Sequence, residues 1–150
     1  MNEISWQLKS FSEMDTKFLY DVLHMRNEVF VVEQNCPYQD LDYKDQQSYH
    51  LCGFVDNTPV AYVRIIPPGV AFEQASIGRV LTVASYRGGG TGRLLMKEAI
   101  ERTYELFDIS EIRIGAQLYL LKFYESLNFK QISPTYLEDD IPHIEMIHSK

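Results

Sequence analysis

The stretch from Val80 to Phe107 constrains the fold of this chain more than any other part of its sequence. A β-rich run over 76–83 leads into the glycine-rich segment 86–92, and an amphipathic helical pattern follows. Glycine tolerates positive φ, so consecutive amides there can point at one anion. The open N–H groups at the start of a helix also favour an anion. The unit therefore predicts a strand, loop and helix that cradle a pyrophosphate, with Arg87 or Arg93 adding a charged contact.

The spacing of these glycines decides which phosphate ligands fit. A P-loop requires G-x-x-x-x-G-K-[ST], and a dinucleotide-binding loop requires G-x-G-x-x-G with an acidic residue about 20 positions later. The sequence has neither pattern; instead, R-x-x-G-x-G runs from Arg87 to Gly92. Taken alone, the glycines are equally compatible with a turn that binds nothing. A nucleotide-binding protein is a further class that a ligand screen would separate.

The remaining elements predict a mixed α/β fold of the order β-α-β-β-β-α-β-α-β-β. Ser12 and Asp15 resemble a capping box at the start of a first helix that ends before Pro37. The segment 33–47 is predicted as a loop with one short helical turn, and 118–127 as a short helix. Alternation and β-rich composition place strands over 4–10, 49–55, 60–66, 76–83, 111–116, 129–132 and 143–148, with an acidic loop at 138–140 before the last. No repeat or linker divides the sequence, so residues 1–150 are predicted to form one domain.

Composition narrows the classes of partner. Fourteen Lys and Arg against 21 Asp and Glu give a net charge of −7, which disfavours a nucleic-acid partner. Cys36 and Cys52 show no metal-ligand or disulfide spacing, and the histidines show none either, so we predict no metal site. Cys36 also lacks an evident base that would make it a nucleophile. The segment Met1–Trp6 is unlike a signal peptide and no run approaches about 18 apolar residues, so we expect a cytoplasmic protein without a membrane partner.

The second half of the chain adds a pattern to the glycine loop. Gln117 and Tyr124 are seven positions apart, which would place them on one face of a helix, roughly 10 Å apart along its axis. Together with the R-x-x-G-x-G loop and the element order, this pattern resembles the GNAT superfamily of N-acetyltransferases over almost the whole chain. The resemblance is greatest to the ElaA-like branch, through the strings Phe30-Val31-Val32-Glu33-Gln34-Asn35-Cys36-Pro37-Tyr38-Gln39-Asp40, Ile77-Gly78-Arg79-Val80, Gly115-Ala116-Gln117 and Ile141-Pro142-His143-Ile144.

This resemblance implies an acyl-CoA N-acyltransferase fold with acetyl-CoA as the co-substrate. The strand over 76–83 would part from the strand over 111–116, and the unpaired backbone groups would bind the pantetheine arm. A backbone N–H of the first strand would be the oxyanion donor. Many relatives have Asn in place of Gln117, but Gln can still donate and accept. The implied cofactor-binding residues are Val80, Leu81, Thr82, Arg87, Gly88, Gly89, Gly90, Thr91, Gly92, Arg93, Gln117 and Tyr124.

The same resemblance assigns roles at the reacting centre. Tyr124 is the general acid for the CoA thiolate, its alternative being a core aromatic with a satisfied hydroxyl. The amine must lose a proton before attack, and Glu33, His143 or a water relay could accept it. Arg79 lies within an apolar strand, where a buried charge needs a carboxylate partner. It could orient Glu33, bind a substrate carboxylate or form a structural ion pair.

We therefore expect an N-acetyltransferase that moves an acetyl group directly onto the amine of a small molecule or peptide. The alternative is a non-catalytic acyl-CoA-binding module with the same fold. The acceptor pocket would be built from the loops 33–47 and 133–142, and polyamines, amino acids, aminoglycosides and protein N-termini all stay open. Monomer and homodimer are equally open. Acidic residues in or beside these loops favour a cationic amine: Glu33, Asp40, Asp42, Glu138, Asp139 and Asp140.

Overall fold

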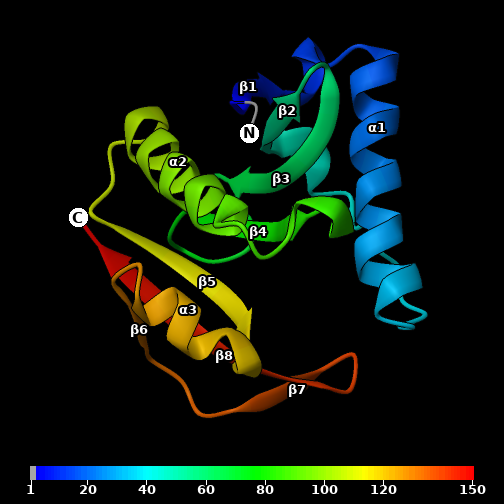
Figure 1. Cartoon of the computed structure of the whole chain (residues 1–150). Helices are drawn as coiled ribbons and strands as arrows, with labels where there is room; N and C mark the ends of the chain where they lie inside the picture. Colours follow the sequence, from blue (N-terminus) through cyan, green and yellow to red (C-terminus); the bar gives the residue numbers. More distant parts are fainter. Residues whose placement is uncertain (1–2) are drawn as a thin grey trace.

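The chain forms two antiparallel sheets that meet at one end and diverge from there (Figure 1). The structure is a computed structural model that describes residues 3–150, so Met1 and Asn2, the start of the segment predicted to be unlike a signal peptide, lie outside the described residues. One sheet has the order β1, β2, β3, β4 and the other the order β5, β8, β6, with β7 paired to β8. The strands are β1 (Ser5–Ser10), β2 (Tyr49–Val55), β3 (Thr58–Ile66), β4 (Ser76–Thr82), β5 (Glu111–Gln117), β6 (Phe129–Gln131), β7 (Tyr136–Glu138) and β8 (Ile141–Ser149).

The first helix starts later than the sequence predicts. Ser10 and Glu13 form the capping box of a 3-10 turn (Phe11–Glu13), and α1 (Thr16–Arg26) begins after Asp15, whose carboxylate accepts the N–H of Phe18 at 2.8 Å. Ser12 is therefore not the cap, because the capping pair lies on either side of it. A π-helical segment, η2 (Asn27–Glu33), extends α1, and the helix ends before Pro37 as predicted.

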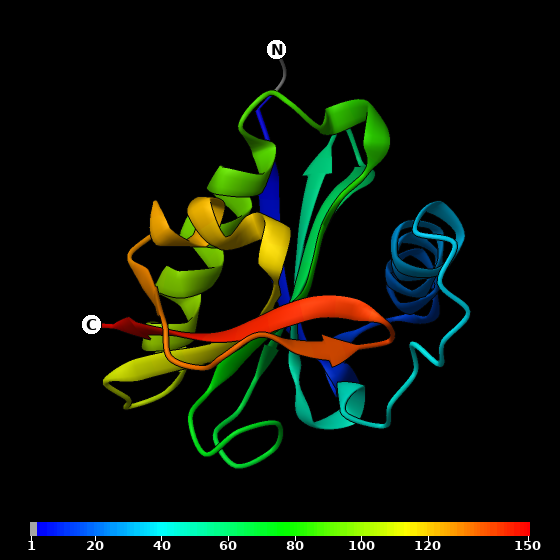
Figure 2. The ribbon, with the colours of Figure 1, turned by 90° about the horizontal axis from the view of Figure 1, so that it is seen from below.

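Two helices cover opposite faces of the first sheet (Figure 2). Phe18, Val22 and Met25 of α1 pack on one face with Cys52 and Tyr62. The other face is covered by α2 (Thr91–Leu106), whose predicted stripe is buried at Leu95, Met96, Ala99 and Thr103, although Phe107 lies just past its end. The short helix α3 (Leu121–Glu125) follows a 3-10 turn, η5 (Leu118–Leu120), and packs on the second sheet.

The two sheets meet where β4 and β5 begin and then separate. Their backbone connection is a parallel bridge between Ala75 and Ile112, in which the N–H of Arg113 donates to the carbonyl of Ala75 at 2.9 Å. Beyond it, β4 pairs with β3 and β5 pairs with β8. This confirms the predicted splay of the sheet between the strands over 76–83 and 111–116.

One expectation about local structure is wrong, and the predicted acidic loop is shorter than expected because Glu138 ends the strand β7, which the sequence did not predict. Gln117 is the last residue of β5 and not part of a helix, so it does not share a helical face with Tyr124. The acidic segment 138–140 is the tip of a hairpin between β7 and β8, with Asp139 and Asp140 at φ 50° and 62°. Strand β7 is too short to show a period-two pattern.

Within residues 3–150, none of the helices has the length and apolar character needed to cross a bilayer. Over the same residues, no three His, Cys, Asp or Glu side chains converge in a way that could hold a metal ion.

Candidate active site

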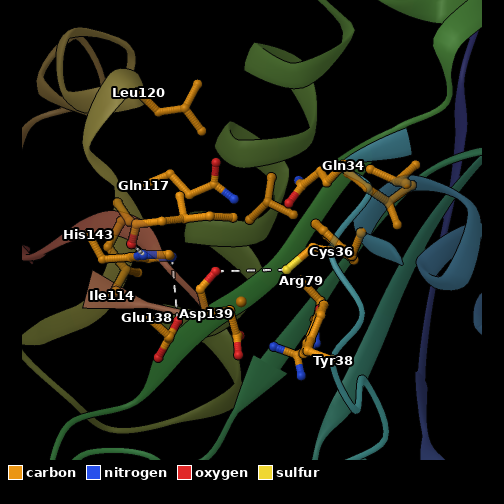
Figure 3. Close-up of a pocket in the computed structure, with 18 of the residues that line it drawn as sticks. Gln34, Cys36, Tyr38, Arg79, Ile114, Gln117, Leu120, Glu138, Asp139 and His143 are labelled. Atoms are coloured by element: carbon orange, nitrogen blue, oxygen red, sulfur yellow. Dashed lines mark hydrogen bonds and ion pairs between the residues drawn. The ribbon is translucent and has the colours of Figure 1, made fainter. Parts of the chain in front are cut away.

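A pocket of about 620 Å³ opens where β4 and β5 diverge (Figure 3). One wall is β4 from Ile77 to Thr82, and the facing wall is the end of β5 with Tyr124 of α3. The loop that follows η2 and the β7–β8 hairpin close the remaining sides. These two segments contribute Gln34, Cys36, Tyr38, Gln39, Asp42, Glu138, Asp139, Ile141 and His143.

The β4 wall contains a β-bulge. Tyr62 pairs with Leu81 and Arg64 with Gly78, so Arg79 and Val80 together face the single residue Val63 of β3. Arg79 has φ 51°, in the left-handed region that side-chain-bearing residues rarely adopt. A bulge twists the strand and redirects its backbone groups. Beyond the Ala75 bridge, the edge of β4 that carries Val80, Leu81 and Thr82 faces the pocket and not another strand.

The glycine loop lies between β4 and α2, and two of its glycines have positive φ. Gly90 is the N-cap of α2 with φ 86°, and Gly88 has φ 83°. A Cβ added at either position would meet no atom within 4 Å, so both face open space. Leu94 makes the first N–H bond of the helix, to the carbonyl of Gly90 at 3.1 Å. The amides of Thr91, Gly92 and Arg93 are therefore available to a ligand.

The two arginines of this loop also hold neighbouring elements. Arg87 donates to the carbonyl of Thr82 at 2.8 Å, and its guanidinium lies 2.7 Å from the carboxylate of Glu33. Arg93 reaches α3 and donates to the hydroxyl of Ser126 at 2.8 Å. Arg87 is the more exposed of the site's ion-paired arginines, with 44% of its side chain accessible. Its charge therefore remains within reach of a phosphate.

Tyr124 combines a core position with access to the pocket. Its ring is 5% exposed and packs edge-on against Phe123 and Phe129, yet the residue lines the pocket. Within residues 3–150, its hydroxyl has no hydrogen-bond partner. Burial raises the pKa of Tyr124 well above its ordinary value of 10.0. The phenol therefore stays in its protonated form at neutral pH.

His143 brings an imidazole to the opposite side of the same pocket. Its Nδ1 lies 2.7 Å from the carbonyl oxygen of Ile141, and because a carbonyl only accepts, Nδ1 carries the proton. In the neutral ring the lone pair is then on Nε2, which lies 3.4 Å from a carboxylate oxygen of Glu138. The ring stacks on Tyr136 with 5.9 Å between centroids. The Nδ1 contact fixes the tautomer and the stacking on Tyr136 fixes the orientation of the ring, whereas the Glu138 carboxylate attracts Nε2 only when that nitrogen carries a proton.

The structure separates the two predicted base residues. Glu33 ends η2 and pairs with Arg87 at the glycine loop, outside the residues that line the pocket. His143 lies in the pocket wall. Arg79 does not orient Glu33, because its guanidinium pairs with Asp40 at 2.7 Å.

Three pocket residues, Gln34, Tyr38 and Gln39, are not among the individual site residues that the sequence predicts, although their loop is. They lie in the string 30–40 that carries the family resemblance and in the predicted pocket loop 33–47, but only the fold brings this loop next to the β7–β8 hairpin. The thiol of Cys36 lies 3.9 Å from the carbonyl of Asp139, so these two segments meet across the pocket (Figure 3). Both segments belong to polar loops that the sequence places between regular elements.

Comparisons with known proteins agree with this geometry. Residues 12–150 match the family model described as "Acetyltransferase (GNAT) domain". The chain is 39% identical to protein ElaA of Escherichia coli over 145 residues, which covers 95% of each chain. The crystal structure of E. coli ElaA superposes with a TM-score of 0.92, covering 98% of this chain and all of that one, at 38% identity. An acyl-CoA N-acyltransferase from Pseudomonas aeruginosa superposes with a TM-score of 0.93 over 98% of this chain and all of that one, at 37% identity.

Proposed function

The chain belongs to the acetyltransferase (GNAT) domain family as an ElaA-like member, and we propose that it transfers an acetyl group from acetyl-CoA directly to an amine. The observation that carries this proposal is that Tyr124 and His143 line one pocket together with the open edge of β4. A proton donor, a proton acceptor and unpaired backbone amides are the groups that aminolysis of a thioester requires.

The residues present fit coenzyme A. Gly88 and Gly90 leave space for a pyrophosphate against the open amides of Thr91, Gly92 and Arg93. The edge of β4 offers hydrogen bonds to the pantetheine amides at Val80 and Thr82. Gln117, at the end of β5, provides an amide side chain on the facing wall.

The chemistry follows from these positions. Nε2 of His143 takes a proton from the ammonium of the acceptor, directly or through water, so that the nitrogen lone pair can attack the thioester carbon. A backbone N–H of the β4 bulge stabilises the oxyanion as the C–N bond forms. Tyr124 gives its proton to sulfur as the C–S bond breaks, and the attacking nitrogen, which still carries one proton too many, loses it through water to the phenolate.

The direct test is an acetyl-CoA consumption assay across an amine library, with released thiol as the readout. We expect turnover of at least one amine. Tight binding of CoA without turnover of any amine would instead support the non-catalytic acyl-CoA-binding module. Stabilisation by ATP or NAD in place of CoA would contradict both and indicate a nucleotide-binding protein.

His143 is expected to be the more important of the two base candidates. His143→Gln removes the basic nitrogen from the pocket and should lower kcat about 100-fold. Glu33→Gln should change kcat by less than about 3-fold, because that carboxylate faces Arg87 and a lost surface ion pair has a small effect. His24→Gln, at an exposed position of α1, is the matched control. A larger loss for Glu33→Gln than for His143→Gln would reverse the assignment.

The charge of the pocket favours a cationic acceptor, on fewer residues than the sequence suggested. Glu33 pairs with Arg87, and Asp40 and Asp42 pair with arginines, which leaves Glu138 and Asp139 as the acidic lining beside His143. Diamines should therefore show at least about 10-fold higher kcat/KM than monoanionic amino acids. Glu138→Gln with Asp139→Asn should reduce that preference. Selective turnover of acidic acceptors would exclude it.

A further inference from the structure

Six charged side chains form a closed ring of ion pairs next to the pocket. Asp40 joins Arg26 (2.9 Å) to Arg79 (2.7 Å), and Asp45 joins Arg26 to Arg64 (both 2.8 Å). Asp42 completes the ring between Arg64 (2.8 Å) and Arg79 (3.5 Å). Each carboxylate thus bridges two guanidinium groups and each guanidinium bridges two carboxylates. The three arginines balance the three aspartates.

Burial makes this ring costly to break. The side chains of Arg26 and Arg64 are 0% and 3% exposed. Burial by itself raises the pKa of Asp42, but the hydrogen bonds and charge of Arg64 outweigh it and hold that pKa below its ordinary value. Removing one member leaves a buried charge without its partner. The ring therefore ties together α1, the loop over 40–45, β3 and β4.

Arg79 is where the ring meets the acyl-transfer site. It occupies the β4 bulge at φ 51°, a conformation that the surrounding structure must stabilise in a residue with a side chain. Three contacts do so: its guanidinium pairs with the Asp40 carboxylate, donates to the Asp40 carbonyl at 2.9 Å, and lies over the ring of Tyr38 at 5.9 Å. Val80 follows it; the register of β4 on β3 turns the N–H of Leu81 toward Tyr62, so the N–H groups of Val80 and Thr82 are the ones on the open edge.

We propose that Arg79 is a positioning residue for acyl transfer: the ion-pair ring locks its left-handed bulge and so aims the amide of Val80, the next residue, at the thioester carbonyl. This inference rests on the proposed function. It also gives Arg79 no role in binding a substrate carboxylate, because Asp40 and Asp42 already neutralise its charge.

Glycine at position 79 separates a positioning role from a direct one. Arg79→Ala removes the ion pairs that hold position 79 at φ 51°, and alanine itself disfavours that conformation. The bulge should therefore relax, and kcat should fall about 100-fold while the KM for acetyl-CoA stays nearly unchanged. Arg79→Gly removes the same guanidinium but adopts positive φ freely, so kcat should be at least about 10-fold higher than in Arg79→Ala. Arg102→Ala, which breaks a half-buried pair with Glu98 on α2, outside the pocket lining, is the control.

A second readout does not depend on turnover. The infrared stretch of acetyl-CoA labelled with ¹³C at the thioester carbonyl should move to lower frequency on binding wild-type protein and Arg79→Gly, and much less on binding Arg79→Ala. This shift tests the bulge even if no amine is acetylated, which would be a failure of the proposed function alone. If Arg79→Ala does not fold, Asp42→Asn opens the ring at a member that is 22% exposed. It should likewise lower kcat and reduce the infrared shift of the bound thioester carbonyl.

Equal kcat values for Arg79→Gly and Arg79→Ala, both far below wild type, would show that the guanidinium acts directly and would overturn the proposal. The proposal would also be overturned if folded Arg79→Ala kept the kcat of the wild type. Where Asp42→Asn is used in place of an unfolded Arg79→Ala, a wild-type kcat in Asp42→Asn would overturn it in the same way.

Discussion

Replacing Tyr124 with phenylalanine should lower kcat for acetyl transfer by about 100-fold while acetyl-CoA binds with nearly unchanged affinity. The substitution keeps the ring that packs against Phe123 and Phe129, so the core loses no contact area. It removes the hydroxyl that we propose as the proton donor to sulfur. The thiolate must then leave unprotonated or take its proton from water.

The pH dependence of wild-type activity is an independent test of Tyr124 as the acid. Because burial raises the pKa of Tyr124, the phenol stays protonated at the pH of about 10 where an exposed tyrosine ionises. The acid is present below its own raised pKa and is lost only above it. The value of kcat should therefore show no decline centred near pH 10 in stopped-time thiol-release assays.

Tyr20→Phe is the matched control, because Tyr20 is 73% exposed on α1 and far from the pocket lining. Its kcat should equal that of the wild type. Normal kcat in Tyr124→Phe with a verified amine would show that Tyr124 is a core aromatic and not the acid, without affecting the fold.

The double variant Gly90→Asp, Gly92→Asp should lose at least about 100-fold in affinity for CoA, measured by titration calorimetry. Two carboxylates would stand where a pyrophosphate approaches the amides at the start of α2, and like charges repel. The two positions differ in backbone: Gly90 has φ 86°, whereas Gly92 is helical and a Cβ there meets Thr82 and Phe123 at ordinary distances of 3.8 and 4.0 Å. Gly92→Asp alone should therefore show the electrostatic loss without backbone strain.

Gly69→Asp controls for that strain. Gly69 has the same φ of 86° and, like Gly90, no atom within 4 Å of an added Cβ, but it lies in the β3–β4 loop. It should cost a similar amount of stability and leave CoA affinity intact. Retention of CoA affinity by the double variant would remove the glycine loop from the binding site.

Local sequence patterns were sufficient for the elements that position this site. The β-rich run of β4, the glycines after it and the apolar stripe of α2 are contained within 31 residues, Ser76–Leu106, and each reflects a preference of its own residues. The splay between β4 and β5 did not follow from these patterns; it was implied by the family resemblance and confirmed by the sheet topology.

The wrong predictions have a common physical cause. The spacing of Gln117 and Tyr124 fits a helical period and so predicts one shared helix, but the backbone of Gln117 pairs with His143 in β8. Strand β7 exists because β8 offers it partners, not because its own residues favour a strand. In both cases hydrogen bonds to a distant segment decided the local conformation.

The sequence alone indicated the family through its resemblance to known motifs. It also predicted the helices, the strands other than β7 and the glycine loop, because these depend on short-range periodicity and on residue types that tolerate few conformations. Only the tertiary structure decided which charges meet. It paired Glu33 with Arg87, placed His143 across the pocket from Tyr124, and closed Arg26, Asp40, Arg79, Asp42, Arg64 and Asp45 into one ring. Ion pairs and hydrogen bonds form between whichever groups the packed elements bring within about 3 Å, and that distance is set by the fold as a whole.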